Sequence, residues 1–431
     1  MTSKGRTVAK LAAIALLLTV VAWSGCAPAP SDVQVEKEKK VKVGISATLT
    51  GAAASSYWAH NHSMFEYLKY VNEELGGIQY ADPVTGKTET VKLDILWEDN
   101  ACNSARSISV WKRWQAAGVM VLTVSCGPSR DGLLAMATRA RIPVIGGGMG
   151  TTNPEYLAIE PLFWTGFRPS VFETKALIIE WYKDQWTESR RPRVNLIQSD
   201  VAVQRMLEQP GGLYDWAESI GVDLLPTEWV PFGTLDHTIQ LTRMMNQDID
   251  LLFFEMPVGE EVAMLNDANR LGIIGKVDMC NTGYAFDESL IGLAPGMTEG
   301  LITSAATVLP SEIDVPGVKL AHELSQSYHG KDATIGYLAG MAAAMPMVEG
   351  IRLALEKVGY ENIDGTAINE GLHHITNLDT LGLTAPITVD PKLPVSNTKE
   401  KICRVENGKL KAITDWIECP EIRGLYPERF R

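Results

Sequence analysis

Residues 91–126, VKLDILWEDNACNSARSISVWKRWQAAGVMVLTVSC, decide the fold class, because they place a helix-like segment between two short apolar runs. The runs Val91–Trp97 and Val119–Val124 are rich in β-branched and other apolar residues, and they predict strands. Ala105–Ala117 lies between them, and its apolar spacing predicts a helix. A strand, a helix and a second strand in this order are typical of a parallel sheet covered by helices.

The same alternation continues on both sides of this stretch. Val41–Ala47 and Pro143–Ile145 predict further strands, and Met64–Glu74 predicts a helix. A second series begins after Leu162–Phe167, with a helix at Glu173–Trp186 and strands at Val194–Gln198, Asp223–Val230, Leu251–Glu255 and Lys276–Met279. A chain of 431 residues is also long for a single hydrophobic core. We therefore predict an α/β fold of two lobes, each built on a parallel-rich sheet.

The C-terminal part of the chain predicts a return to the first lobe. Gly300–Thr307 predicts a strand and Gly336–Lys357 a long buried helix, and both are expected in lobe one. Gly382–Asp390 and Glu400–Ala412 predict extended hairpin structure. We expect lobe one to comprise residues 42–165 and 301–382, and lobe two residues 166–300 and 383–425.

The N-terminus has the pattern of an export signal. Three basic residues precede the apolar run Leu11–Ala22, which is too short to span a bilayer. Trp23-Ser24-Gly25-Cys26 follows and is similar to a lipobox, so we expect residues 1–25 to be a signal peptide and Cys26 to be lipidated. Residues 26–40 would then tether an exported protein to the membrane. Secretion after simple cleavage of the leader is the alternative.

Composition excludes several function classes. The chain is 45% hydrophobic and 21% charged, which is typical of a folded globular protein, and its net charge of −13 disfavours nucleic acid as a partner. No Gly-x-Ser-x-Gly elbow is present, and acid pairs such as Glu98-Asp99 are adjacent and so diverge. His60, His62 and the pair His373-His374 lack the spacing of a metal site. We expect neither catalysis, nor a cofactor, nor a metal.

Ligands of open parallel sheets bind beyond the carboxyl ends of the strands. The sequence places loops there in both lobes: residues 48–59, 98–103, 125–131 and 146–152 in lobe one, and residues 198–203, 255–259 and 280–287 in lobe two. Many of these residues are small, hydroxylated or aromatic. A small molecule held between the two sets of loops is therefore the expected ligand.

The motifs Trp97–Cys102, Ser125–Ser129 and Gly150–Glu155 together resemble the leucine/isoleucine/valine-binding branch of type I periplasmic binding proteins. The resemblance extends from about residue 42 to 415. It implies two Rossmann-like lobes joined by a three-strand hinge, near Thr165, Gly300 and Leu383 in this chain. It also implies the solute-binding component of an ABC importer, which captures an amino-acid-like or amide-like ligand by hinge closure.

Such a protein delivers its ligand to a membrane permease, whose ATPase subunits drive transport. A sensory receptor of the same fold is the alternative, and an exported hydrolase is a third reading that lacks positive evidence. The resemblance further implies a disulfide between Cys102 and Cys126. From the residues themselves, Cys403 and Cys419 flank a hairpin-like stretch and make a second pair plausible, which leaves Cys280 as a free, buried thiol.

The ligand-binding positions of the family match this sequence better in lobe one than in lobe two. The lobe-one positions fall at Gly127 and around Gly150, Thr151 and Thr152, and we expect Pro128, Ser129 and Gly148 of the same loops to bind the ligand with them. The lobe-two positions fall on Val203, Pro257 and Thr282, where the family has two tyrosines and an acid. The ligand therefore stays open among neutral amino acids, amides, aromatic acids and cationic compounds.

Other side chains in the loops offer replacements. Glu255 or Asp200 would supply a negative charge, Thr282 and Tyr284 would add hydroxyls, and Tyr57 and Trp58 would form an aromatic lid. A second interpretation stands beside each assignment. Glu255 would instead cap a helix or pair with an arginine, and the two aromatic residues would instead pack on the surface of their own lobe.

Overall fold

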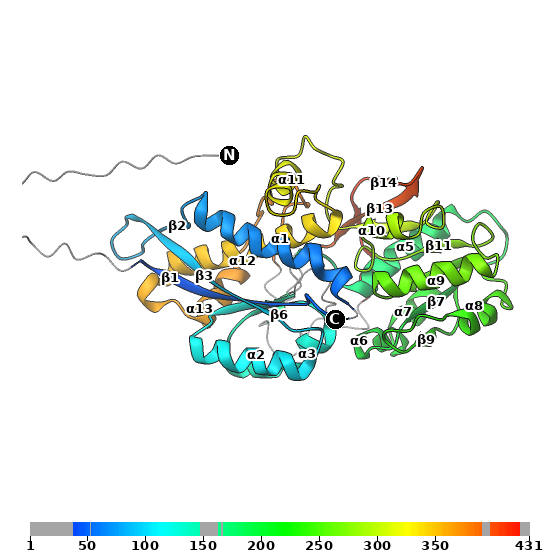
Figure 1. Ribbon diagram of the computed structural model, residues 1–431, viewed down its shortest axis with the longest axis horizontal. Coiled ribbons are helices and arrows are strands. Elements are labelled where there is room, and N and C mark those ends of the chain that lie inside the picture. Colours follow the sequence, from blue (N-terminus) through cyan, green and yellow to red (C-terminus); the bar gives the residue numbers. More distant parts are fainter. Residues whose placement is uncertain (1–37, 52, 147–162, 165–166, 390–396, 423–431) are drawn as a thin grey trace, which may run out of the picture. The chain divides into compact units, whose positions relative to one another are not determined.

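The computed structural model describes residues 38–51, 53–146, 163–164, 167–389 and 397–422, which form two sheets with helices against them (Figure 1). The described strands of the first sheet have the order β2-β3-β1-β4-β5-β6. Their bounds are β1 Lys40–Ala47, β2 Ile78–Ala81, β3 Thr88–Asp99, β4 Val121–Val124, β5 Val144–Gly146 and β6 Phe163–Trp164. All pairs are parallel except β2 with β3.

The second sheet has the order β14-β13-β12-β11-β10-β7-β8, with β9 paired to β7 and β15 to β13. Its strands are β7 Arg193–Ser199, β8 Asp223–Leu224, β9 Glu228–Val230, β10 Leu251–Glu255, β11 Asp278–Cys280, β12 Ile302–Ala305, β13 Lys399–Glu406, β14 Lys409–Ala412 and β15 Ile417–Glu418. The pairs among β7 to β12 are parallel, and β13 runs antiparallel to β12. The predicted two α/β lobes are therefore confirmed.

Helices cover both faces of the first sheet (Figure 1). They are α1 Ala54–Glu73, α2 Ser104–Ala117, α3 Gly127–Arg139, α11 Pro316–His329, α12 Ile335–Val358 and α13 Gly365–His373, with a 3-10 turn η3 Tyr360–Asn362. On one face, α1 and α12 bury Met64, Leu68 and Met341 against β1. On the other, Trp111 and Trp114 of α2 pack with α3 on β4. Gly340 lets α12 approach the His60 carbonyl of α1, where a Cβ would collide.

The second sheet is covered by α5 Val171–Gln185, α6 Ala202–Arg205, α7 Leu213–Ser219, α8 Thr238–Met245, α9 Val258–Arg270 and α10 Ser289–Leu293, with a 3-10 turn η2 Met206–Glu208. Helix α5 begins with a capping box between Ser170 and Glu173. Among the described helices, α12 alone is long and apolar enough to cross a membrane, but most of it is buried in the core of lobe one.

Several predicted boundaries differ from the structure. Helix α1 begins at Ala54, ten residues before the predicted start at Met64, because its N-cap Ala53 lacks the side-chain cap that marks a helix start in sequence. The predicted single strand 223–230 is two short strands, β8 and β9. The predicted extended segment 382–390 contains, in its described part, the bridge from Ile387 to Leu378 but no named strand.

The expected division between the lobes also needs correction at two places. Strand β12 pairs with β11 and β13 in the second sheet, so the chain re-enters lobe one after this strand and not at residue 301. Leu383, Ile387 and Val389 pack in the core of lobe one, although residues from 383 onward were expected in lobe two. A strand that is apolar and buried on both faces is compatible with either sheet. Its sequence alone therefore does not show which strands it pairs with.

The cysteines follow the predictions in part. Cys102 and Cys126 form a disulfide, and Cys280 is a buried free thiol. The expected pair of Cys403 and Cys419 is wrong, because both are buried free thiols. The N–H of Cys419 bonds to the carbonyl of Thr398, which lies five positions before Cys403. At about 3.3 Å per strand residue this separation is far beyond disulfide reach.

Candidate functional site

A cavity of about 110 Å³ lies where the carboxyl ends of strands from both sheets meet. Lobe one contributes the start of α1 and the loop after β4, and lobe two the loops after β7, β9, β10 and β11. The described lining residues are Ala53, Ser56, Tyr57, Cys126, Gly127, Pro128, Ser199, Val201, Gln204, Phe232, Glu255, Met256, Pro257, Tyr284 and Ala285. The position agrees with the loops that the sequence identifies.

A buried hydrogen-bond network around Asn100 orders the lobe-one loops. Its side-chain Nδ2 donates to the carbonyls of Ser46 and Ser125, at 2.9 and 3.2 Å. Its Oδ1 accepts from Thr48 Oγ1 and from the backbone N–H of Cys102, both at 2.8 Å. The ends of β1, β3 and β4 are thereby held together by one side chain.

The disulfide fixes the start of α3 at the cavity. Cys102 and Cys126 both have positive φ angles, 53° and 74°, in a region that non-glycine residues seldom occupy. Cys126 is the N-cap of α3 and provides no side-chain cap, and Gly127 and Pro128 form the first turn beside the cavity. The first N–H groups of a helix have no acceptors within it, and because Pro128 has no N–H, Gly127 is the residue of this pair whose N–H is available as a donor at the cavity.

Tyr57 lines the lobe-one side from the first turn of α1. Burial raises the pKa of its hydroxyl to about 12, while the nearby Arg130 opposes this shift and Glu255 adds to it. The hydroxyl is therefore protonated at neutral pH, and the backbone N–H of Cys126 bonds to it at the edge of the cavity.

Glu255 lines the lobe-two side at the end of β10, and it is part of a buried triad. Lys175 Nζ of α5 lies 3.0 Å from Glu255 Oε2, and both side chains are almost completely buried. Gln204 joins them, accepting from Lys175 Nζ at 2.6 Å and donating to Glu255 Oε1 at 2.9 Å. Burial lowers the pKa of Lys175, and the charge of Glu255 opposes this effect. The carboxylate is thus neutralised by a lysine and not by the arginine that the sequence interpretation allowed.

Tyr284 also lines the cavity, and its side chain has partners in lobe two. The hydroxyl donates to the carbonyl of Pro169, and the guanidinium of Arg168 lies 3.8 Å from the ring centroid. Arg168 is itself paired at 3.1 Å with the buried Glu400 of β13. The Tyr284 hydroxyl, which the sequence predicts as a ligand contact, thus donates to the backbone near the crossover between the lobes.

Four further predicted residues lie outside the cavity lining. Asp200 is half-exposed and forms a bidentate pair with Arg205, at 2.7 Å for both contacts. Thr282 is buried, and its Oγ1 accepts from the N–H of Tyr284. Ser129 is buried within α3. Trp58 points to a different cluster, described below.

The remaining predicted residues divide into two groups. Tyr57, Gly127, Pro128, Glu255, Pro257 and Tyr284 line the cavity. Gly148, Gly150, Thr151 and Thr152 lie outside the described residues, and Val203 belongs to α6 without a described side chain.

Sequence reasoning missed several residues at the cavity. Ser56, Ser199, Gln204, Phe232 and Met256 are among the lining residues that it did not single out. It also missed Lys175, which supports the site from behind. The signal was present: Lys175 interrupts the otherwise apolar face of α5, and a lysine at such a position needs a buried partner.

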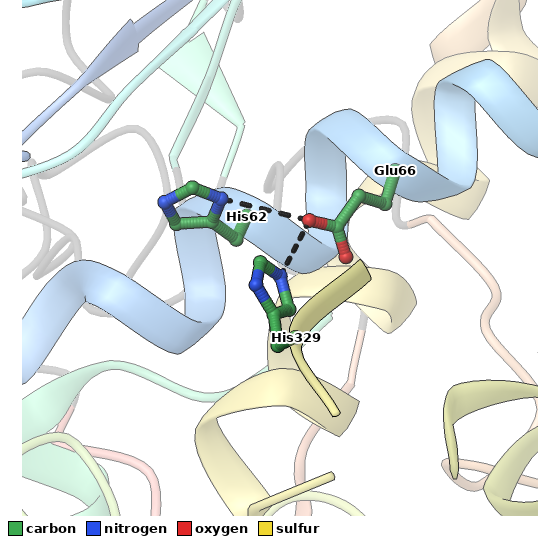
Figure 2. Close-up of side chains that lie close together, drawn as sticks. All are labelled: His62, Glu66 and His329. Carbon is green, nitrogen blue, oxygen red and sulfur yellow. Dashed lines mark hydrogen bonds and ion pairs between the residues drawn. The ribbon is translucent and has the colours of Figure 1, made fainter. Parts of the chain in front are cut away.

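A second cluster of polar side chains lies in lobe one. His62 and Glu66 of α1 and His329 of α11 direct their ligand atoms to one place (Figure 2). The sequence predicted no metal-ligating set, because His329 is 263 positions from Glu66 and neither histidine has a cysteine or acid at a recognisable zinc spacing.

Comparison with models of known families matches residues 40–396 to the family described as periplasmic binding protein. No curated protein matches the chain at a significant level. Among solved structures, a branched-chain amino acid ABC transporter protein from Thermus thermophilus with bound valine has a TM-score of 0.76 and 19% identity, covering 90% of this chain and 98% of that one.

Two other solved structures have the same fold with different ligands in their descriptions. A solute-binding protein of an ABC transporter from Rhodopseudomonas palustris, in complex with 3,4-dihydroxybenzoic acid, has a TM-score of 0.69 and 18% identity, covering 90% of this chain and 99% of that one. A fatty acid ABC transporter substrate-binding protein from Thermomonospora curvata has a TM-score of 0.71 and 15% identity, covering 89% and 93%. At these identities the likeness establishes the fold.

Proposed function

The chain belongs to the periplasmic binding protein family, and we propose that it is the exported solute-binding component of an ABC importer. The observation that carries this proposal is the cavity, which is lined by loops of both lobes at the carboxyl ends of their sheets. A ligand held there contacts both lobes only when they are closed. It therefore shifts the population toward the closed form, which a permease and its ATPase subunits recognise.

The lining supports a small ligand with a polar and an apolar part. Tyr57, Ser199 and Glu255 offer polar atoms, while Phe232 and Met256 offer apolar surface. Lys175 balances the charge of Glu255, which favours a ligand without a large net charge of its own. An amino-acid-like or amide-like compound has these properties, and we propose this class. The relative from Thermus thermophilus, solved with valine, is consistent with it.

The proposal includes that the chain binds its ligand without catalysing a reaction. No histidine lines the cavity among the described residues, and the hydroxyl of Ser56 accepts a backbone hydrogen bond. The N-terminal pattern supports export, with cleavage before Cys26 and a lipid anchor on this residue. These N-terminal residues lie outside the described part of the chain.

The test is a thermal-shift screen of the purified chain against amino acids, amides, aromatic acids, fatty acids and polyamines. A ligand at 100 times its dissociation constant stabilises by about 2.7 kcal/mol, which is readily measured. We expect a clear upward shift for a compound of the amino-acid or amide class, with stoichiometry and affinity then measured by calorimetry. Stabilisation by another class alone would correct the proposed ligand.

Two tyrosines of α1 allow a matched control. Tyr57→Phe removes a hydroxyl from the cavity lining and is expected to weaken binding by about two- to tenfold. Tyr70→Phe changes the same group on the same helix outside the lining and is expected to bind as the parent does. Equal affinities of the two variants would show that the ligand does not bind in this cavity. Catalytic turnover of a bound compound would contradict the proposal that the chain only binds its ligand.

A further inference from the structure

We propose that His62, Glu66 and His329 form a binding site for a divalent transition-metal ion, with Zn²⁺ as the expected occupant. The site lies within lobe one and is separate from the ligand cavity, because none of its three residues lines that cavity. The proposal therefore stands independently of the proposed transport function.

The three ligand atoms already converge. His62 Nδ1 lies 3.5 Å from Glu66 Oε1, and His329 Nε2 lies 2.7 Å from the same oxygen. All three atoms lie within 4.8 Å of one another, and Figure 2 shows both rings directed at the carboxylate. Tetrahedral zinc, with bonds of about 2.0–2.1 Å to nitrogen and oxygen, holds its ligand atoms about 3.3 Å apart. To admit the ion, His329 Nε2 would move about 0.6 Å away from Glu66 Oε1, and the two ring nitrogens would approach each other by at most about 1.5 Å.

The local structure explains why these atoms meet. His62 and Glu66 are four residues apart on α1 and so share one face of the helix. His329 is the last residue of α11, whose chain is turned by Gly330 in the left-handed region with φ of 63°. An ion at this place would connect two helices that are far apart in sequence.

Neighbouring side chains hold the ligands as an outer shell does in metal sites. The Tyr337 hydroxyl donates to Glu66 Oε2, which orients the carboxylate and leaves Oε1 directed at the histidines. The Trp58 ring packs against both imidazoles, with centroids 4.5 Å from His62 and 4.7 Å from His329. These contacts fix the rings before any ion binds, which reduces the entropy cost of binding.

The three side chains differ in how far they are exposed to solvent. The Glu66 side chain is 2% exposed, whereas His329 is 15% and His62 27% exposed. The carboxylate is thus almost completely buried, while the partly exposed histidines connect the cluster to solvent. Lys331 is a positive charge that would repel a metal ion at this place, since its Nζ lies 3.6 Å from the Trp58 ring centroid. Lys331 is exposed, however, so its side chain can turn away into solvent.

The donor set selects the class of ion. Two imidazoles and one carboxylate suit Zn²⁺, Co²⁺, Ni²⁺ and Cu²⁺, whereas Ca²⁺ and Mg²⁺ require oxygen ligands. A cluster in which the two histidines only form hydrogen bonds with Glu66 is the competing explanation, and it predicts no metal binding.

The test uses the purified protein produced without a histidine tag, treated with a chelator and desalted. Titration with Co²⁺ is expected to give the visible absorption of tetrahedral cobalt at one equivalent, which Zn²⁺ then abolishes. Mg²⁺ and Ca²⁺ serve as negative controls. Absence of the cobalt band, or a strong sulfur-to-cobalt band that assigns the ion to the free cysteines, would overturn the proposal.

Variants assign the site. His62→Gln and His329→Gln change partly exposed residues and are expected to weaken Zn²⁺ binding by about tenfold or more. His374→Gln makes the same change at an exposed histidine outside the cluster and is the matched control. Zn²⁺ is also expected to raise the melting temperature of the parent and of His374→Gln but not of the two site variants. Unchanged affinity in both site variants would contradict the assignment.

Discussion

The Oγ of Ser56 accepts a hydrogen bond from the backbone N–H of Val258, at a distance of 3.0 Å. Ser56 lies in the first turn of α1 in lobe one, and Val258 is the first residue of α9 in lobe two. The first N–H of α9 has no acceptor within its own helix, so a side chain of the opposite lobe satisfies it. The bond crosses the lobes beside the ligand cavity, which Ser56 also lines.

Ser56→Ala is therefore expected to favour the open form. Loss of one neutral hydrogen bond costs about 0.5–1.5 kcal/mol, which lowers the affinity for a compound identified in the thermal-shift screen by about two- to tenfold. Calorimetry gives the affinity, and small-angle scattering gives the fraction of closed protein. Ser55→Ala changes the neighbouring exposed serine and is expected to match the parent. Equal affinity in both variants would show that the bond has no part in closure.

Lys175→Met is expected to destabilise the fold. The change leaves the buried Glu255 without its cation, which costs about 3–5 kcal/mol in the free energy of unfolding measured with urea. The double variant Lys175→Met, Glu255→Gln removes both charges and is expected to recover much of this loss.

Lys183→Met is the control on the same helix, because Lys183 is exposed and its substitution is expected to change stability by less than about 0.5 kcal/mol. If the double variant is no more stable than Lys175→Met alone, the ion pair is not the origin of the effect.

Much of the fold follows from local pattern. The runs Val41–Ala47, Val91–Trp97 and Leu251–Glu255 became β1, β3 and β10, because apolar β-branched runs of this length favour buried parallel strands. The start of α1 was missed because Ala53 and Ala54 give no capping signal, and this error placed Tyr57 and Trp58 in a loop.

The sequence predicts only a part of the candidate site, because several of its residues contact partners that are far away in the sequence. Glu255 and Tyr57 were recognised because they follow strand ends in the sequence. Their partners depend on packing between distant segments: Lys175 is 80 positions from Glu255, and His329 is 263 positions from Glu66. Residue type and spacing do not reveal such pairs in a single sequence.

Removal of the disulfide is expected to cost both stability and binding. Cys102 and Cys126 close a loop with a sequence separation of 24, for which the chain-entropy model gives about 3–4 kcal/mol. The bond also fixes Cys126 at positive φ beside the cavity. The double variant Cys102→Ser, Cys126→Ser should melt at a lower temperature and bind its ligand more weakly. Cys280→Ser, which changes a free thiol, tests whether loss of any cysteine has this effect.

Glu288 is expected to make stability depend on pH. Burial raises the pKa of its carboxyl from about 4.5 to about 8, and the charge of Asp287 adds to the shift. Its Oε2 accepts from the N–H of Ile335, the first residue of α12, at 2.8 Å. Between pH 4.5 and 8 the folded chain retains a proton that the unfolded chain releases, so the free energy of unfolding falls as pH rises through this range and levels off above it.

Glu288→Gln keeps an acceptor for Ile335 and removes the titration. Between pH 5 and 8.5, the parent is therefore expected to lose about 2–4 kcal/mol more unfolding free energy than the variant. Glu323→Gln, which makes the same change at a solvent-exposed position, should follow the parent. Urea denaturation of the three proteins at both pH values measures the difference, and parallel behaviour of all three would exclude Glu288 as its source.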